Sequence, residues 1–274
     1  MMRSPALTAA KDPLLDEWLL NTPLATINGN VPQRAFAYSA RQAIVGGGWP
    51  ARFGENLTKV ASGGTVGSVL GAGPPYAVKC PTGGAYLAAT PGFANPGLKD
   101  FIFEVLAAPA VGANYATSQY FLVKGSDPVG FGDFLCLAFI GASNSTLKAS
   151  FGAQIVYPAL FTLYSANLSE GYHHIWAAVN RDEASVNGAR MGVDGSLSGT
   201  GVNPSVLVAS DITTNKPLAL GGNWDATGFP GAPGCLVAVQ AWYGGDISDN
   251  FIAAGAAGQT EIEAVMAKRF AMSL

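Results

Sequence analysis

The chain has 274 residues, of which 49% are hydrophobic and only 12% are charged. This charged share is about half the usual one, so we expect much of the surface to lie against other subunits. The net charge of −3, from 15 Lys and Arg against 18 Asp and Glu, argues against nucleic-acid binding, which requires a basic face. No apolar run has the ~18 residues of a membrane span, and the first residues lack the apolar core of a secretory signal. We therefore expect that the chain does not insert into a membrane. We also expect it to fold in a reducing cytoplasm.

The first 75 residues are predicted to form an arm rather than a domain. Asp12 and Pro13 are suited to the start of a short helix, as its cap and first turn. The apolar face of this helix consists of Leu14, Leu15, Trp18 and Leu19. We expect this face to anchor the arm on another chain or on the sandwich. The rest of the arm is rich in Gly and Pro, with one strand or short helix at 34–45, and has too few periodic apolar residues to close a core.

From residue 76 the pattern changes to short strands separated by turn residues, which is typical of an antiparallel β-sandwich. In the clearest strand, 173–180, the alternation predicts a strand that is half buried against a core. Alternate residues from Ile175 to Val179 are expected to face the core, with Trp176 on the opposite side. The predicted strands are 76–80, 86–89, 100–107, 118–124, 134–140, 146–151, 161–165, 173–180, 189–193, 217–221 and 236–243.

Residues 248–274 are predicted to form a C-terminal helical segment. Thr260 and Glu263 have the spacing of a capping box. Ile262, Val265 and Met266 begin an apolar face that continues to Phe270.

The order of these motifs resembles the laminin G-like and concanavalin A-like jelly rolls. The matching pieces are YAVKCPTGGAYLAA (76–89), DFIFEV (100–105), FLVKGS (121–126), GYHHIWAAVN (171–180), MGVDG (191–195), PLALGGN (217–223) and GCLVAVQAWYGGDIS (234–248). The resemblance implies an all-β fold, a two-sheet antiparallel jelly roll over residues 76–247. Tyr172 stands where the family commonly has Trp, and Ala85 where it often has an acidic residue. The second departure weakens any cation or glycan site carried over from the family.

Catalytic residues are not evident. Related jelly rolls that hydrolyse glycans carry two carboxylates two or four residues apart on one strand, whereas Glu104 has Ile102 and Leu106 at those positions. The adjacent His173 and His174 point to opposite faces of a strand and cannot chelate one metal together. We expect one of them to be hydrogen-bonded beneath a loop and the other exposed, and we predict that the protein is not an enzyme.

Two candidate binding sites depend on residues near strand ends. Asp194, Asn223 and Asp225 offer oxygen ligands for a calcium ion, although turn chemistry explains Asp194 and Asn223 equally well. No other cofactor is expected. Trp224, Phe229 and Trp242 form either an aromatic platform for sugars or ordinary core and subunit contacts.

The cysteines Cys80, Cys136 and Cys235 are far apart and form no CxxC pair. We interpret them as buried thiols, since Cys packs as a small hydrophobic residue.

The leading hypothesis is a non-catalytic structural protein of a virion, a capsid decoration or tail component. Its jelly roll would serve assembly or display, and its arm would anchor it to other virion subunits or to further copies of the chain. The alternative is a glycan-binding adhesion or receptor-binding module that recognises a cell surface. A glycan-active enzyme is the third hypothesis.

Overall fold

The structure is a computed structural model that describes residues 33–40, 48–61, 67–69, 77–80, 84–108, 119–125, 134–143, 146–154, 160–169, 171–181, 188–205, 207, 211–222, 234–244 and 266. The side chains of some residues within these strands are not described. The predicted helix near residue 13 lies outside these residues, and so does the predicted C-terminal helix apart from Met266, which is helical and buried.

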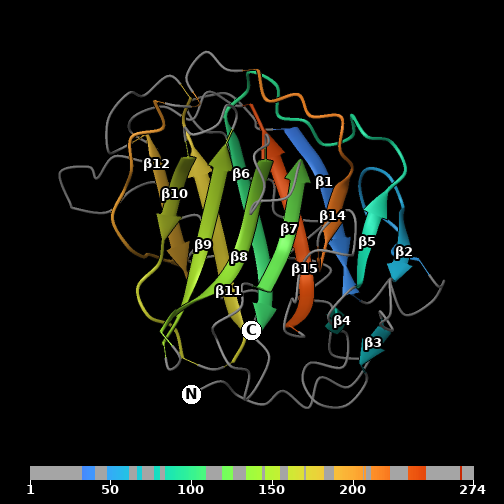
Figure 1. Cartoon of the computed structure of the whole chain (residues 1–274), viewed down its shortest axis with the longest axis horizontal. Coiled ribbons are helices and arrows are strands. Elements are labelled where there is room, and N and C mark those ends of the chain that lie inside the picture. Colours follow the sequence, from blue (N-terminus) through green and yellow to red (C-terminus); the bar gives the residue numbers. More distant parts are fainter. Residues whose placement is uncertain are drawn as a thin grey trace.

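The described residues form two antiparallel sheets that pack face to face (Figure 1). The back sheet has the order β13 (Ser196–Leu197), β12 (Ala189–Val193), β11 (His173–Val179), β6 (Phe101–Ala108), β15 (Gly234–Tyr243), β4 (Ala77–Cys80) and β3 (Gly67–Val69), with β1 (Gln33–Ser39) also paired to β15. The front sheet has the order β10 (Leu160–Tyr164), β9 (Thr146–Gln154), β8 (Phe134–Ser143), β7 (Gln119–Gly125), β14 (Leu218–Leu220), β5 (Gly84–Ala88) and β2 (Leu57–Ala61). The predicted two-sheet sandwich is therefore confirmed.

Every strand predicted after residue 76 is present, with its ends displaced by at most a few residues. The region before residue 76 also contributes to the sheets. The segment expected as a strand or short helix at 34–45 forms β1, which pairs with β15, while β2 and β3 pair with β5 and β4. The division into an arm (1–75), a jelly roll (76–247) and a C-terminal segment (248–274) stays a prediction. The apolar face that begins at Leu14 lies outside the described residues.

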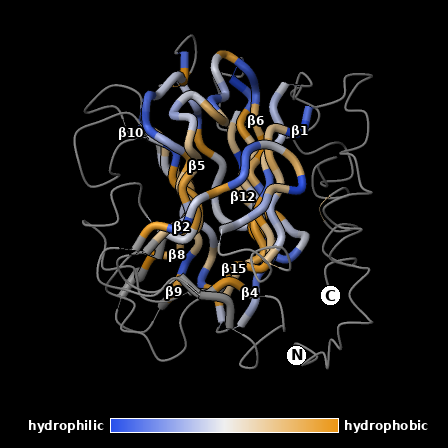
Figure 2. Tube along the Cα trace, turned by 90° about the vertical axis from the view of Figure 1, so that its right-hand side faces the viewer, coloured by the Kyte–Doolittle hydropathy of each residue, from blue (hydrophilic) through white to orange (hydrophobic). Residues whose placement is uncertain are grey.

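The core lies between the two sheets, which Figure 2 shows edge-on. Alternate residues of β6 and β11 face inward, and Phe103 packs its ring 5.9 Å from that of Phe151 on the opposite sheet. Trp49 connects the sheets in a second place, since its ring lies 5.9 Å from Tyr38 of β1 and 5.2 Å from Tyr86 of β5. Burying each large apolar side chain stabilises the fold by about 1.5–3 kcal/mol.

Strand β11 is buried on both faces, so the prediction of a half-buried strand was wrong. Ile175, Ala177 and Val179 join the central core, as expected. Trp176 and Ala178 point the other way, and both are also fully buried. The outer face of the back sheet is thus an interior layer of the molecule.

Among the residues that the structure describes, no helix has the length and apolar character needed to cross a membrane.

Candidate functional site

A buried polar cluster lies on the outer face of the back sheet. Glu104 of β6 stands between His174 of β11 and Gln240 of β15, on adjacent strands. His174 Nε2 donates to Glu104 Oε1 over 2.9 Å, and Gln240 Nε2 donates to Glu104 Oε2 over 2.6 Å. All three residues are 0% exposed. The carboxylate therefore has a donor on each oxygen and no access to solvent.

This environment gives Glu104 a structural role. A glycosidase needs a carboxylic acid that reaches the substrate, whereas both oxygens of Glu104 are engaged by neighbouring side chains. His174 is occupied by the same contact. The prediction that one of the two histidines is exposed was wrong, because His173 is 6% exposed and His174 0%.

Trp242, the one described member of the predicted aromatic platform, lies on this same outer face. It is 3% exposed, and the guanidinium carbon of Arg34 lies 4.5 Å from the centre of its ring. This cation–π contact occupies a ring face that a sugar would need. Trp224 and Phe229 lie outside the described residues, so the platform as a whole stays a prediction.

Asp194, the one described member of the predicted calcium site, is engaged with protein donors. It has a φ of 53° and lies in the turn between β12 and β13. Its Oδ2 lies 2.8 Å from His173 Nδ1, and its Oδ1 accepts the backbone N–H of His174 over 3.0 Å. Asn223 and Asp225 are not described. Within the described ranges no group of three or more His, Cys, Asp or Glu could hold a metal ion, and the calcium site stays a prediction.

Cys136 of β8 is a free, buried thiol. Burial raises its pKa to about 12, against a smaller opposing effect of a hydrogen bond with the backbone of Gly152. Because the thiolate is the reactive form, this cysteine is chemically inert at neutral pH. The side chains of Cys80 and Cys235 are not described.

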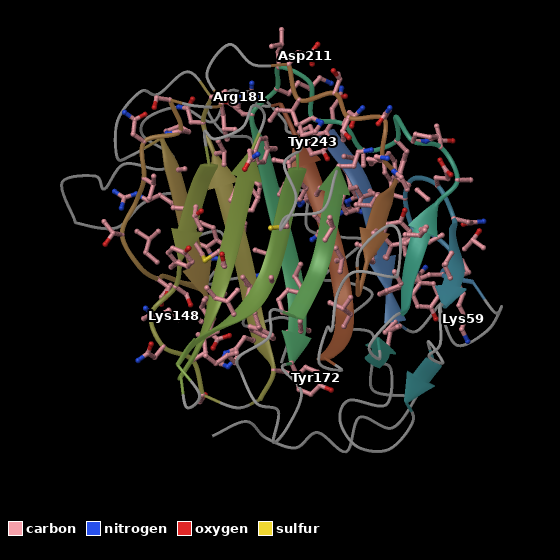
Figure 3. The ribbon with its side chains drawn as sticks, viewed as in Figure 1. Lys59, Lys148, Tyr172, Arg181, Asp211 and Tyr243 are labelled. Atoms are coloured by element: carbon pink, nitrogen blue, oxygen red, sulfur yellow. The ribbon has the colours of Figure 1, made fainter. Side chains whose placement is uncertain are left out.

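A second candidate site is formed by loops at one end of the sandwich. We call it the loop face and define it as residues 53–56, 89–100 and 211–217. Figure 3 shows Arg181, Asp211 and Tyr243 at this end and Tyr172 at the opposite end. Loops that a rigid β-scaffold positions are where binding residues concentrate.

The three segments of the loop face are held together by hydrogen bonds. Glu55 Oε1 accepts the backbone N–H groups of Ala89 and Thr90 over 2.5 and 2.8 Å. Asn95 Nδ2 donates to the carbonyl of Thr214 over 3.1 Å, and its Oδ1 accepts the N–H of Thr214 over 3.3 Å. These contacts join segments that are far apart in the sequence and reduce the freedom of the loops.

Residues at the ends of the sandwich strands also form hydrogen bonds with these loops. Arg181 donates from its backbone N–H to Asp100 Oδ1 over 2.7 Å and from Nη1 to the carbonyl of Gly97 over 3.0 Å. Tyr243 Oη donates to the carbonyl of Ala94 over 2.7 Å. Ala94 has a φ of 61°, a conformation that non-glycine residues seldom adopt and that costs about 1–3 kcal/mol. The surrounding contacts maintain this strained backbone.

Apolar side chains project from this braced scaffold. Phe53 is 50% exposed and Leu98 66%. Of the described large apolar residues that are exposed, Tyr164 on β10 is the remaining one, at 47%. Thr90, Lys99 and Asp211 are also exposed on the loop face. The arrangement is a surface held by hydrogen bonds, with exposed apolar side chains among exposed polar ones.

Lys124 of β7 is a buried cation beneath the loop face. The residue is 1% exposed, and its Nζ donates to the carbonyls of Pro91 and of Lys216, the latter over 2.6 Å. We expect Lys124→Met to lower the free energy of unfolding by about 1–3 kcal/mol, because the carbonyls of Pro91 and Lys216 lose their charged donor. Urea unfolding measures this loss. The control is Lys59→Met at an exposed position, with an expected effect within about 0.5 kcal/mol. Equal effects of the two substitutions would contradict the role of Lys124.

The sequence matches no protein-family model and no curated protein. The structure is similar to the binding domain of botulinum neurotoxin DC in complex with rat synaptotagmin II, with 10% identity, a TM-score of 0.55, and coverage of 87% of this chain and 51% of that one. The same domain in complex with SialylT has 9% identity, a TM-score of 0.55 and the same coverage. The serotype D binding domain has 8% identity, a TM-score of 0.53, and coverage of 79% and 48%. This chain thus spans about half the length of those toxin domains, and the likeness shows the fold.

Proposed function

We propose that the protein is a non-catalytic binding module that recognises a cell-surface glycan through the loop face. The observation that carries this proposal is the bracing of the loops around exposed Phe53 and Leu98. Ordering the loops before binding reduces the entropy that binding would otherwise cost. An exposed aromatic ring such as Phe53 offers the apolar contact that the face of a sugar ring requires.

Two further observations support a binding role. The carboxylate of Glu104 is enclosed and hydrogen-bonded on both oxygens, so it serves the fold. The similar toxin domains are binding domains, and their structures contain SialylT in one case and synaptotagmin II in another. A sandwich of this kind is compatible with either class of ligand, and the exposed aromatic ring favours the glycan.

A glycan array probed with the purified protein tests this proposal. We expect a defined set of glycans to bind. We expect Phe53→Ala and Leu98→Ser each to raise the dissociation constant at least about tenfold, which corresponds to a loss of about 1.4 kcal/mol of binding free energy. The thermal midpoint should change less than the affinity does, because both side chains are at least half exposed.

Tyr164→Ser provides the matched control, since it removes an exposed apolar side chain from β10, away from the loop face. Its affinity should equal that of the unmodified protein. If no glycan binds, the ligand class is wrong. If glycans bind but Phe53→Ala and Leu98→Ser have no more effect than Tyr164→Ser, the site is wrong.

A structural role in a virion, as a capsid decoration or tail component, is the second candidate. The supporting observation is that charged residues make up only 12% of the chain, which suits a surface covered by other subunits. Light scattering distinguishes the two proposals. A closed oligomer whose formation requires the exposed apolar residues would favour assembly, and a monomer that binds glycans would favour recognition.

A further inference from the structure

Residues 96–99 of the loop face form a tight turn that carries Leu98. The backbone N–H of Lys99 donates to the carbonyl of Pro96 over 3.2 Å, which closes the turn. Gly97 occupies the second position with a φ of 64°, a conformation that glycine adopts without strain. Leu98 occupies the third position and is 66% exposed. Because so little of this leucine is buried, its position depends on the backbone on either side of it.

Gly97 joins the turn to another segment of the loop face through a bridge of two hydrogen bonds. Its N–H donates to the carbonyl of Ile212 over 3.2 Å, and its carbonyl accepts the N–H of Ile212 over 3.0 Å. Both bonds are made by one residue of the turn, so the bridge alone would let the turn pivot about it. A second point of attachment is needed to fix the direction in which Leu98 points.

Arg181, which follows β11, contacts the chain on both sides of Leu98. Its Nη1 donates to the carbonyl of Gly97 over 3.0 Å, and its backbone N–H donates to Oδ1 of Asp100 over 2.7 Å. The carbonyl of Asp100 also accepts the N–H of Gly244, directly after β15, over 2.8 Å. Figure 3 shows Arg181 at this end of the sandwich. The turn is therefore attached to the ends of two strands of the back sheet.

These attachments are shielded from solvent. Arg181 is 3% exposed and Asp100 is 7% exposed. A hydrogen bond from a charged donor is stronger than one between neutral groups, and in a buried position water does not compete for it. The same burial keeps the side chain of Arg181 out of reach of a ligand on the surface. Any effect of Arg181 on binding must therefore pass through the residues that it holds.

We propose that Arg181 is a positioning residue of the loop face, which fixes the direction of Leu98 and increases the affinity for the glycan without contacting it. This inference rests on the proposed function. A loop that is held in its bound conformation loses less entropy when the ligand binds, so its affinity is higher. The dependence on Leu98 distinguishes this role from a contribution of Arg181 to overall stability.

Hydrogen exchange of the free protein tests whether Arg181 holds the turn. Arg181→Met removes the Nη1 donor and leaves the backbone N–H in place. We expect the amides of Gly97 and Lys99 to exchange about tenfold faster or more, because a hydrogen bond from a charged donor is lost. Glu104→Gln is the control, since it destabilises the back sheet away from the turn, and exchange at the turn should rise less in this variant. Equal rates at the turn in the two variants would overturn the proposal.

A double-mutant cycle with Leu98 tests the role in recognition, with the glycan that gives the strongest signal on the array as the probe. Arg181→Met should raise the dissociation constant about three- to tenfold. In the Leu98→Ser protein the same change should raise it less than about twofold, because no leucine remains to be positioned. Glu104→Gln should leave the dissociation constant unchanged. Equal effects of Arg181→Met with and without Leu98 would overturn the proposal.

The outcomes separate this inference from the proposed function. If Arg181→Met does not fold, Arg181→Lys takes its place in both experiments, because its shorter side chain moves the donor away from the carbonyl of Gly97 and keeps the charge. If no glycan binds the unmodified protein, the proposed function is wrong and the role of Arg181 in recognition is overturned with it. If glycans bind and Leu98→Ser weakens binding but Arg181→Met does not, the proposed function stands and the positioning role is overturned.

Discussion

Replacing Gly192 with alanine is expected to cost about 3 kcal/mol or more of folding free energy, because the new methyl group would overlap a buried indole. Gly192 of β12 is paired with Trp176 of β11. A Cβ at Gly192 would lie 2.1 Å from Cε2, 2.2 Å from Cζ2 and 2.4 Å from Nε1 of Trp176. The tryptophan is 0% exposed and has little room to move, so the strands would have to separate. Urea unfolding followed by fluorescence measures the loss.

Gly92→Ala is the matched control for this substitution. Gly92 is exposed in the loop after β5, and apart from its own residue and its two chain neighbours no heavy atom would lie within 4 Å of an added Cβ. Its effect should stay within about 0.5 kcal/mol. Combining Gly192→Ala with Trp176→Leu should cost less than the sum of the two single changes, since the overlap is removed. If Gly192→Ala and Gly92→Ala unfold at the same urea concentration, the packing of Trp176 across β12 is wrong.

The alternating pattern of β11 shows what local sequence can predict. Ile175, Ala177 and Val179 repeat with the period of a strand and do face the core. The turn at Asp194-Gly195 also has the positive φ angles that its residues favour, 53° and 81°. Strand positions and the inward face depend on neighbours in the sequence, and for that reason they were predictable.

The pairing of strands that are far apart in the sequence was harder to predict. Strand β1 pairs with β15, which is about 200 residues further along the chain, and no local pattern encodes that partner. The burial of both faces of β11 has the same origin. Trp176 is apolar whether or not a layer covers it, so the alternation alone did not distinguish a half-buried strand from an enclosed one.

The polar cluster illustrates this limit at the level of single residues. Glu104 and His174 were each identified in the sequence, but they are 70 positions apart, and Gln240 is 136 positions from Glu104. Only the order of strands in the back sheet brings them together. Their function as mutual hydrogen-bond partners follows from that order.

The loop face was missed for a different reason. Phe53 and Leu98 lie in segments rich in Gly and Pro, where isolated apolar residues carry no periodic signal. The contacts that brace the loops come from Glu55, Asn95 and Lys124, whose partners are mainly backbone groups. A hydrogen bond to a backbone group does not depend on the residue type of the partner, so the sequence does not indicate it. A run of turn residues with isolated exposed apolar side chains is the one signal that the sequence offered.

Replacing Glu104 with alanine is expected to lower the free energy of unfolding by about 3–5 kcal/mol, because it removes the shared acceptor of two buried donors. Those donors are His174 Nε2, at 2.9 Å, and Gln240 Nε2, at 2.6 Å. Without the carboxylate, both would be left in an interior that solvent does not reach. Glu104→Gln should cost less, about 1–3 kcal/mol, since its carbonyl still accepts one hydrogen bond while its amide opposes the other donor.

A combined replacement separates the loss of hydrogen bonds from the loss of volume. Substituting leucine at Glu104, His174 and Gln240 together removes every member of the cluster, and buried polar groups replaced together by apolar ones cost little or even stabilise. We expect this variant to be more stable than Glu104→Ala.

The same proteins should release no sugar from polysaccharides, with or without Glu104. Cleavage that Glu104→Gln abolishes would give the carboxylate a catalytic role. In the unfolding experiment, a loss below about 1 kcal/mol in Glu104→Ala would show that the cluster does not stabilise the sheet, because a shared buried acceptor cannot be removed at so small a cost.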